Sequence, residues 1–530
     1  MSHHERMPPR KKAARPLTRS VLIIGSEALP FAKTGGLADV LGALPVALGR
    51  LGWDVTLALP RYRGVSAGER VDAFPVTVGS VTRDVSFYSA PLSDRANALL
   101  IDCPELYDRD ALYGTAAAEY PDNARRFGML ARAALEFAGR PPSPRRSGDG
   151  AKAGSGAARP FDVVHAHDWQ AGLAPVYLKS IYATHPVLAG MPSVFTIHNL
   201  AYQGLFPPDW LPRLDLPGQL FSMAQLEFWG RISFLKGGIN HAELVSTVSP
   251  RYAEEVQTPE FGSGFDGILR ARSDRLSGIL NGINTDVWDP AHDPFLPAPY
   301  DAKDLTGKGA SKAAVLARFG LGADGSGAAR PLIGMISRMV DQKGLDLIAM
   351  LAEDLPRLGA TFVVLGTGEE RYEQLWKRMA AAHPDRIGVY VGFNEGLAHL
   401  IEAGSDMFLM PSRFEPCGLN QMYSLRYGTV PIVRAVGGLA DTVHDAHPFP
   451  GPGSGGASAR QARPNGFVFH DYSPAALLEA LNRALGGFAD REAWRALQLA
   501  GMAEDHSWDR SAREYVKMYE RAITMRAPAM

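Results

Sequence analysis

The sequence predicts an α/β protein of two domains, each with a doubly wound, largely parallel sheet. Along both halves of the chain, short β-rich apolar runs alternate with stretches of helical periodicity, the pattern of βαβ units. Several of these runs end in polar residues, as strands do where an open α/β sheet binds its ligand. The 530 residues have room for two to four domains, and 46% hydrophobic with 21% charged residues is a globular composition.

Charge and cysteine content argue against several classes of partner. Because 55 basic and 56 acidic residues nearly cancel, we expect neither nucleic acid nor a membrane surface as a partner. No apolar run approaches the roughly 20 residues of a membrane span. Cys103 and Cys417 lie far apart and offer neither a disulfide framework nor metal-ligand spacing, which suits a reducing cytoplasm.

The first domain is expected over residues 21–285, after a basic tail at 1–20 that we expect to be disordered. The apolar run that follows this tail is too short for a signal-peptide core. A strand at 21–24, a helix at 37–51 and a strand at 54–60 predict a parallel βαβ unit. The other predicted elements are hairpin strands within 75–102, a helix at 124–138, a mobile insertion at 141–160, and strands at 162–169, 193–199, 244–250 and 279–284.

The second domain is expected over residues 331–505, after an interdomain connection at 286–330. We expect the final helix, within 506–530, to pack back on the first domain. The predicted strands are 332–338, 361–366, 387–391, 407–410 and 430–433. The predicted helices are 344–358, 369–382, 395–403, 418–427, 473–486, 490–501 and 508–523, with a Gly- and Pro-rich loop at 448–464.

A glycine turn joins the first strand to the first helix. It runs from Gly25 to Gly36 and includes Lys33 and the pair Gly35-Gly36. Backbone can approach a ligand closely at such a turn, and the helix that follows directs unpaired N–H groups at it, so an anion is favoured there. An ordinary structural turn with a solvated Lys33 accounts for the same residues.

Two cations lie on a strand-to-helix loop of the second half. Arg338 and Lys343 suit a diphosphate, since charge-assisted hydrogen bonds contribute about 1.5 to 3 kcal/mol each. Negative charge on a departing phosphate is stabilised even more in a dry cleft. The alternative is a pair of solvated surface charges.

Two further loops of the second half carry candidate groups. Glu415 lies between a strand and a helix, where it could orient a sugar, oppose developing positive charge or only cap the helix. The amides of Cys417, Gly418 and Leu419 would form the helix N-terminus and could donate to sugar hydroxyls or phosphate. The glycine turn at 437–442 is either a phosphate cradle or merely a turn.

Metal binding and nucleophilic catalysis are weaker interpretations of this sequence. His165, His167 and Asp168 resemble a ligand set, but residues at the end of one strand point to alternate faces and cannot all reach one ion. Cys417 has no paired base nearby in sequence, so we expect a packed thiol. We therefore predict no metal site.

Together these residues resemble the bacterial glycogen synthase and plant starch synthase family, from about Val21 to the C-terminal helices. Its members are retaining glucosyltransferases of the GT-B arrangement, in which two Rossmann-like domains face each other across an active-site cleft. The motifs that carry the resemblance are Lys33-Thr34-Gly35-Gly36-Leu37-Ala38-Asp39, His165-Ala166-His167-Asp168-Trp169, His198-Asn199-Leu200-Ala201-Tyr202-Gln203-Gly204, Asn281-Gly282, Ser337-Arg338 with Lys343-Gly344, Glu415-Pro416-Cys417-Gly418-Leu419, and Gly437-Gly438-Leu439-Ala440-Asp441-Thr442.

The resemblance implies a reaction of glycogen biosynthesis. Glucose would pass from ADP-glucose to the non-reducing end of an α-1,4-glucan with its α configuration retained. Arg338 and Lys343 would hold the diphosphate, with Lys33 and the amides of Gly35 and Gly36 approaching from the other domain. GT-B enzymes usually need no bound metal, and no cofactor is implied.

The resemblance also implies roles around the transferred sugar. His198 would hydrogen-bond the donor glucose near its anomeric centre, and Glu415 would orient the sugar or stabilise an oxocarbenium-like state. Related transferases often carry a second glutamate eight positions later, where this chain has Tyr423, so no ribose-binding role is assigned there. The implied substrate-binding set is completed by Asp39, Asp168, Asn281, Cys417, Gly418, Leu419, Gly437, Gly438 and Asp441.

Two other functions fit the same architecture. A glucan phosphorylase shares it but needs a lysine Schiff base to pyridoxal phosphate, for which the second half offers no convincing lysine. A glycan-binding protein could keep the fold without turnover, since fold alone does not establish function. Against this second alternative stand Arg338, Lys343 and Glu415, all of which are present.

Overall fold

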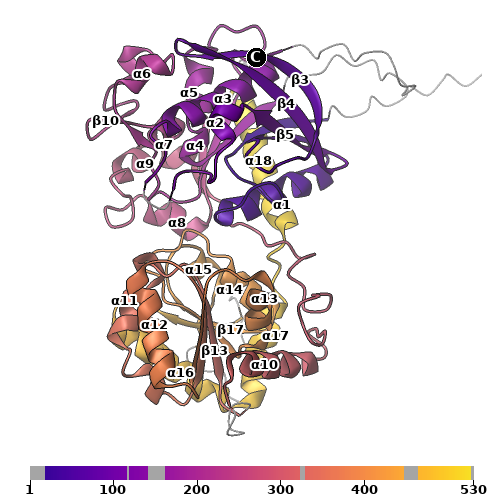
Figure 1. Ribbon diagram of the computed structural model, residues 1–530, viewed down its shortest axis with the longest axis vertical. Helices are drawn as coiled ribbons and strands as arrows, with labels where there is room; N and C mark the ends of the chain where they lie inside the picture. Colours follow the sequence, from indigo (N-terminus) through magenta and orange to yellow (C-terminus); the bar gives the residue numbers. More distant parts are fainter. Residues whose placement is uncertain (1–17, 116–117, 141–160, 323–328, 447–462, 527–530) are drawn as a thin grey trace, which may run out of the picture.

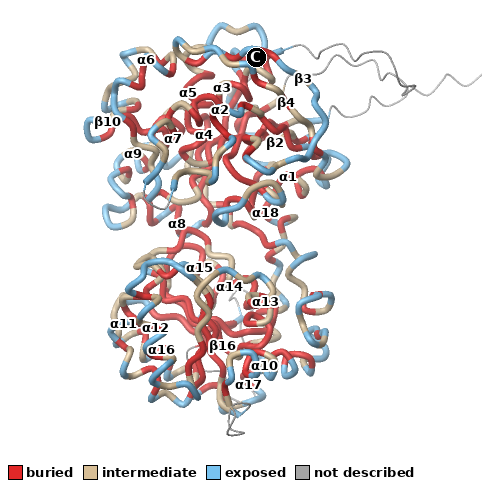
Figure 2. The backbone as a smooth tube through the Cα atoms, viewed as in Figure 1, coloured by how far each residue is buried: buried red, intermediate tan, exposed pale blue. Residues whose placement is uncertain are grey.

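A computed structural model of the chain shows two α/β domains placed end to end (Figure 1), and it describes residues 18–115, 118–140, 161–322, 329–446 and 463–526. The expected insertion at 141–160, nearly all of the expected tail at 1–20 and most of the expected loop at 448–464 lie outside the described residues. Figure 2 shows a buried interior in each half. Within the described residues, no helix combines the length and the apolar character that crossing a membrane requires.

The first domain is built on a nine-stranded sheet of order β12-β11-β7-β6-β1-β2-β5-β4-β3. β4 pairs antiparallel with both β3 and β5, and the other neighbours are parallel. The strands are β1 (Ser20–Ile24), β2 (Asp54–Pro60), β3 (Glu69–Val78), β4 (Val81–Ser93), β5 (Ala96–Asp102), β6 (Val163–His167), β7 (Ser193–Ile197), β11 (Leu244–Thr247) and β12 (Leu276–Gly278).

Helices cover both faces of this sheet, and β1 at its centre shows why. Val21 and Ile23 pack into one apolar cluster, which includes the buried face of α1 (Gly36–Arg50). Leu22 and Ile24 point the other way, into the cluster that includes α3 (Asn123–Gly139). A strand buried on both faces has no polar alternation, which is why a continuous apolar run marks it in the sequence.

Shorter elements complete the first domain. A small antiparallel sheet has the order β8-β10-β9. Its strands are β8 (Leu205–Phe206), β9 (Glu227–Phe228) and β10 (Arg231–Ser233). The short helices are α2 (Pro104–Tyr107), α4 (Asp168–Ala171), α5 (Leu173–Lys179), α6 (Trp210–Arg213), α7 (Phe234–His241), α8 (Pro250–Glu255) and α9 (Asp266–Ala271).

The second domain has a six-stranded parallel sheet of order β15-β14-β13-β16-β17-β18. The strands are β13 (Leu332–Ile336), β14 (Thr361–Gly366), β15 (Ile387–Val391), β16 (Met407–Met410), β17 (Val430–Arg434) and β18 (Phe467–Phe469), of which only β18 was not predicted. The helices are α10 (Thr306–Phe319), α11 (Leu345–Met350), α12 (Glu370–Ala382), α13 (Glu395–Gly404), α14 (Asn420–Arg426), α15 (Gly437–Thr442), α16 (Pro474–Phe488) and α17 (Arg491–Met502).

Two predicted segments differ from the structure. The strand expected at 279–284 is β12 at Leu276–Gly278, and the apolar run after it is a loop that crosses between the domains. The connection expected at 286–330 contains the helix α10. Val315 and Leu316 of this helix are buried in an apolar cluster beside the second sheet, so α10 belongs to the second domain.

The final helix, α18 (Trp508–Arg526), returns to the first domain and packs on α1 (Figure 1). The ring of Tyr519 lies 5.2 Å from that of Trp53, and the helix shares its apolar cluster with β1. Where the chain crosses back, the Ile283 amide donates to the His506 carbonyl at 2.8 Å. Two chain crossings therefore lie side by side between the domains.

Candidate active site

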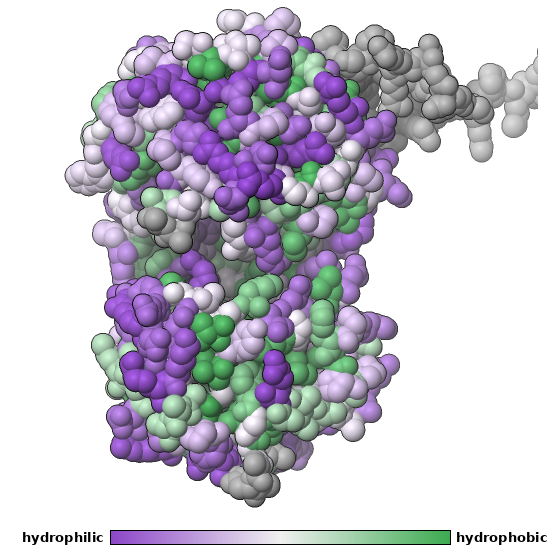
Figure 3. Space-filling view, viewed as in Figure 1, coloured by the Kyte–Doolittle hydropathy of each residue, from purple (hydrophilic) through white to green (hydrophobic). Residues whose placement is uncertain are grey.

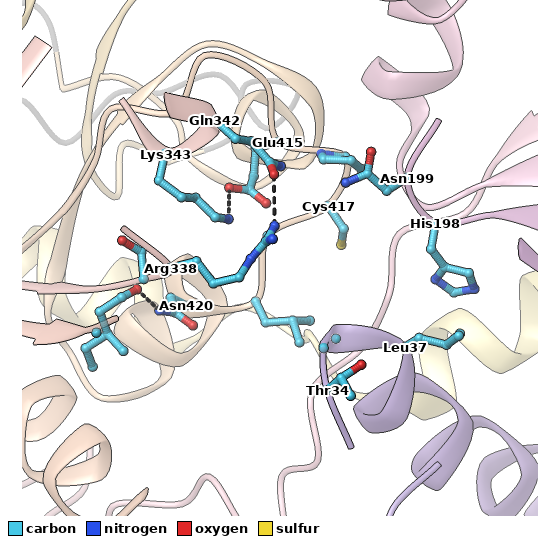
Figure 4. A pocket seen from close by; sticks show the side chains of 18 of the residues that line it. Thr34, Leu37, His198, Asn199, Arg338, Gln342, Lys343, Glu415, Cys417 and Asn420 are labelled. Carbon is cyan, nitrogen blue, oxygen red and sulfur yellow. Dashed lines mark hydrogen bonds and ion pairs between the residues drawn. The ribbon is translucent and has the colours of Figure 1, made fainter. Parts of the chain in front are cut away.

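A cavity of about 710 Å³ lies between the two domains and is lined by both. Figure 3 shows the surface hollowed at this junction. In Figure 4, Arg338, Lys343 and Glu415 of the second domain lie on one side, and Thr34, Leu37 and His198 of the first domain lie on the other. The lining comes largely from loops at the carboxyl ends of strands, where an open sheet is expected to bind its ligand.

Lys343 and Glu415 form an ion pair on the second-domain wall. Their Nζ and Oε2 atoms are 2.5 Å apart, and the Ser412 hydroxyl donates to the same carboxylate at 3.0 Å. Both side chains are largely buried, with 18% of Lys343 and 7% of Glu415 exposed. The structure therefore brings the predicted cation and the predicted carboxylate into contact within one site.

A glycine allows Lys343 to approach the Glu415 loop. Gly344 has φ +76°, and a Cβ there would lie 2.1 Å from the Pro411 carbonyl oxygen. A residue with a side chain would be both strained and in collision with backbone. Gly344 therefore lets the backbone next to Lys343 lie close against the loop that carries Glu415.

Arg338 extends along the same wall from the end of β13. Its guanidinium donates to Gln342 Oε1 at 3.0 Å and to the Tyr202 hydroxyl of the first domain at 3.3 Å. Both partners are neutral, so the positive charge of Arg338 is available to an anion in the cavity. Tyr202 is half exposed, and it is the first-domain group that meets this cation.

Asn281 and Cys417 meet beneath the Glu415 loop. Burial raises the pKa of Cys417 to about 12, against the effect of the neighbouring Asn281. A thiol that keeps its proton is a poor nucleophile, which agrees with the predicted packed thiol. The side-chain oxygen of Asn281 is buried without a hydrogen-bond partner among the described residues, and Asn281 lines the cavity.

The glycine turn of the first domain forms part of the opposite wall. Gly35 caps α1, and both Gly35 and Gly36 line the cavity. Glu27 holds this turn, accepting hydrogen bonds from the Thr34 amide and, at 2.8 Å, from the Thr34 hydroxyl. Burial raises the pKa of Glu27, and these hydrogen bonds oppose the rise. The buried Glu27 carboxylate therefore holds the glycine turn in place.

Lys33 and Asp39 do not reach the cavity in this structure. They form an ion pair of 2.7 Å, and neither is among the described residues that line the cavity. Burial raises the pKa of Asp39, while Lys33 acts to lower it. The predicted donor contact of Lys33 is consequently not formed in this conformation.

Asp168 and His198 stand together on the first-domain wall. Asp168 has φ +55°, in the left-handed region, and its carboxylate accepts the His198 amide at 2.7 Å. Burial raises the pKa of Asp168 to about 7, against the effect of the His198 and Asn199 amides. Burial lowers the pKa of His198 to about 3, so its ring is neutral. A strained aspartate thus holds the backbone of the predicted sugar-contacting histidine.

Similarity to known proteins identifies the family. Residues 20–271 match the family model of the starch synthase catalytic domain, and residues 324–496 match that of glycosyl transferases group 1. A glycogen synthase of Koribacter versatilis is 44% identical over 96% of this chain and 99% of its own length. Glycogen synthase 1 of Methylococcus capsulatus is 47% identical over 95% and 96%. The chain belongs to the glycogen synthase and starch synthase family of glycosyltransferases.

Solved structures of related proteins agree with this assignment. The catalytic domain of starch synthase IV from Arabidopsis thaliana, bound to ADP and acarbose, has a TM-score of 0.81 and 33% identity and covers 96% of this chain and 99% of its own. A sucrose-phosphate synthase of Thermosynechococcus elongatus, 15% identical with a TM-score of 0.58, shares the fold. The predicted family, GT-B fold and glycogen synthase function are confirmed.

The second glycine turn of this glycosyltransferase is not among the described residues that line the cavity, and the substrate contacts of Gly437, Gly438 and Asp441 stay predictions. The Gly437 amide donates to both carboxylate oxygens of Glu255 at 3.0 Å, and the Asp441 carboxylate accepts the Arg251 amide at 2.8 Å. A Cβ on Gly437 would lie 1.9 Å from the Glu415 carbonyl oxygen. This glycine segment, which forms α15, is therefore hydrogen-bonded to α8 and lies directly against the backbone of the Glu415 loop.

The predicted helix end at Cys417, Gly418 and Leu419 begins later than expected. Helix α14 starts at Asn420 with Leu419 as its cap, so Cys417 and Gly418 precede it. Gly418 has φ +71°, a left-handed conformation that glycine adopts without strain, in the loop that leads into α14. All three residues nevertheless line the cavity.

The histidines beside Asp168 are engaged with other side chains. His165 is hydrogen-bonded to Tyr519 and Thr196, and His167 to His198. Among the described residues, no group of three or more His, Cys, Asp or Glu side chains could hold a metal ion.

Sequence reasoning gave no site role to several residues that line the cavity, among them Glu27 and Phe393. Glu27 follows β1 by three residues, and Phe393 follows β15 at Val391 by two. Phe393 lines the cavity yet is 77% exposed. The strand-end rule that pointed to Asp168 applies equally to both, so it could have found them.

Proposed function

We propose that this glycosyltransferase transfers α-glucose from ADP-glucose to the non-reducing end of an α-1,4-glucan, with retention of configuration. The single observation that carries the proposal is the contact of Lys343 with Glu415, beside Arg338, on the wall of a cavity shared by two domains. Cations beside a carboxylate suit a substrate with an anionic leaving group and a sugar that becomes positively charged. The ADP and acarbose bound to the Arabidopsis relative support this choice of ligands.

Arg338 and Lys343 bind the diphosphate in this proposal. Lys343 would share its charge between Glu415 and the phosphate oxygens, since an ammonium group has three donors. Arg338 would exchange its neutral partners, Gln342 and Tyr202, for phosphate oxygens. Each new charge-assisted hydrogen bond contributes about 1.5 to 3 kcal/mol.

Phe393 receives the nucleobase. An aromatic ring that lines the cavity and is mostly exposed leaves apolar area for a flat ligand group. Stacking of a base on an aromatic side chain contributes about 1 to 3 kcal/mol. The adenine of the donor would therefore lie against the second domain, next to the diphosphate site.

The transferred glucose lies between Glu415 and the first-domain wall. Glu415 would stabilise positive charge at the anomeric carbon, while His198, Asp168 and Asn281 hydrogen-bond the sugar hydroxyls. The acceptor glucan would enter along the first domain. Lys33 would leave Asp39 and reach the diphosphate as the domains close, with the Gly35 and Gly36 amides beside it.

Two units move in this closure: the described parts of residues 21–285 with the final helix, and α10 with the described parts of residues 331–505. We also propose that the enzyme works in the cytoplasm, on the support of Cys103 and Cys417, which are both buried and free.

The test is incubation of the purified chain with glycogen and either ADP-glucose or UDP-glucose, following nucleotide release. We expect release from ADP-glucose, elongation of α-1,4 chains, and no added metal requirement. Lys343→Ala serves as the control for contaminating activity. Release of nucleotide from neither donor would refute the proposed reaction, and faster release from UDP-glucose would refute the proposed donor.

A further inference from the structure

A row of buried histidines lies directly behind the sugar side of the cavity. His198 lines the cavity, and its Nε2 atom is 2.9 Å from Nδ1 of His167. His167 is fully buried, and its ring centroid lies 3.9 Å from that of His165, which is also fully buried. Neither His165 nor His167 is among the described residues that line the cavity. Any effect of His167 on a bound sugar must pass through His198.

The two buried histidines differ in their hydrogen bonds. His165 has a partner on each nitrogen: Tyr519 at 2.8 Å on Nδ1 and Thr196 at 2.6 Å on Nε2. His167 has His198 on Nδ1, but its Nε2 is buried and has no partner among the described residues. This unpaired nitrogen decides where the proton between His167 and His198 resides.

Burial lowers the pKa of all three histidines, so each neutral ring carries a single N–H. If His198 donated to His167, the His167 proton would sit on Nε2, as a buried donor without an acceptor. Buried N–H groups without a partner are rare because their desolvation is not compensated. If His167 donates from Nδ1 instead, its Nε2 is a bare nitrogen and no donor is stranded.

We propose that His167 is a positioning residue: it donates from Nδ1 to His198 Nε2 and thereby fixes His198 in the Nδ1–H tautomer. His198 Nδ1 has no hydrogen-bond partner in the described part of the chain and is not one of its buried unpaired atoms, so it is open to the cavity. The N–H there donates to a hydroxyl of the transferred sugar and cannot accept a proton. The identity of that sugar rests on the proposed function, whereas the tautomer does not.

The tautomer can be read without any substrate. In the full chain labelled with ¹⁵N-histidine, long-range ¹⁵N–¹H correlation distinguishes a protonated from a bare ring nitrogen, and His198→Gln assigns the His198 signals. We expect a protonated Nδ1 and a bare Nε2 on His198. A protonated Nε2 on His198 overturns the proposal, and because the measurement involves no turnover, it stands even if the proposed reaction fails.

Two variants of nearly equal size separate donation from packing. The amide N–H of His167→Asn can replace the Nδ1–H donor, whereas the carboxylate of His167→Asp, assayed at a pH where it is ionised, only accepts and draws the His198 proton onto Nε2. We expect kcat to fall less than about threefold in His167→Asn and at least about tenfold in His167→Asp, with donor KM changing less than kcat in both. Equal losses of kcat in the two variants would overturn the proposal.

His165→Asn is the matched control. His165 is as buried as His167, but its hydrogen bonds go to Tyr519 and Thr196 and not to His198. We expect this variant to lower Tm while leaving the His198 tautomer in place. If it changes the tautomer as His167→Asp does, general packing and not donation from His167 controls His198, and the proposal is wrong. Should the His167 variants fail to fold, the measurement on the unmodified chain still decides.

Discussion

The two walls of the cavity differ in how far their charged groups are assembled. On the second-domain wall, Lys343 already contacts Glu415 at 2.5 Å and Arg338 lines the cavity. On the first-domain wall, Lys33 is paired with Asp39 and lies off the lining. In the proposed function the second wall therefore exchanges only neutral partners of Arg338 to hold a diphosphate, whereas the first must exchange an ion pair before it contributes its cation.

The contacts that join the walls are also unlike each other. At one edge, buried groups hold α8 to α15 and to the Glu415 loop: the Gly437 amide donates to Glu255, and the Ser249 hydroxyl donates to the Pro416 carbonyl at 2.6 Å. Nearer the mouth, the link is an exposed hydrogen bond of 3.3 Å between Arg338 and Tyr202. Breaking the exposed link costs little, so we expect closure to rearrange the mouth and to preserve the buried edge.

Removing a charge from the assembled wall should have the largest effect. Lys343→Ala leaves Glu415 buried without its cation and removes a group that stabilises the leaving phosphate, and Glu415→Ala removes the opposing carboxylate. We expect either change to lower turnover at least about 10²-fold. Initial rates with saturating glycogen measure this. As a control, alanine substitution of Lys377, an exposed lysine of the same domain, should leave turnover unchanged. Near-normal turnover in both site variants would refute the role of Lys343 and Glu415 in stabilising charge during the reaction.

Lys33→Ala tests the wall that must rearrange. Among the described residues, Asp39 is the only hydrogen-bond or ion-pair partner of Lys33, so its removal should leave the fold intact and impair donor use by about tenfold, the value of one charge-assisted hydrogen bond. Donor KM and kcat, together with Tm, measure this. The exposed first-domain residue Lys517 supplies the matched alanine control. If Lys33→Ala fails to fold, Lys33 and its glycine turn have a structural role and the proposed donor contact is wrong.

Phe393→Ala should have a smaller effect, confined to donor binding. Loss of one stacking contact of about 1 kcal/mol raises the donor KM about fivefold and leaves kcat nearly unchanged. Phe393→Tyr keeps the ring and should restore the KM. Met350→Ala removes a comparably exposed apolar side chain elsewhere on the second domain and controls for surface effects. A fall in kcat without a change in KM would show that Phe393 does not receive the base.

The fold of this chain was largely predictable because its parallel strands are buried on both faces and read as continuous apolar runs. β2, β14, β15 and β16 begin and end at the predicted residues. The prediction failed where an element is very short or its pattern is weak: β18 has three residues, and α10 shows weak amphipathic contrast within an irregular segment. Tertiary contacts fix both.

The site was predictable to the extent that each residue acts next to its own strand. Strand ends placed Arg338, Lys343, Asp168 and His198 on one cavity. The sequence could not tell that the glycine pair at 437–438 donates to Glu255, because that contact joins residues 182 positions apart in the other domain. Nor could it tell that Lys33 pairs with Asp39, since this pair depends on how the glycine turn lies against the start of α1.

The buried Asp168 of the first wall should make the stability of the protein depend on pH. Burial raises the pKa of Asp168 to about 7, above the roughly 3.9 of an unfolded aspartate, so the folded state retains a proton that the unfolded chain releases. The stability from Asp168 is therefore complete below about pH 4 and is lost as pH rises to about 7. Asp168→Asn cannot ionise, so its Tm relative to the unmodified chain should rise between pH 4 and pH 8. A constant difference in Tm across this range would mean that Asp168 is ionised in the folded state throughout. The cost of Asp168 to stability would then come from its left-handed backbone and not from its burial.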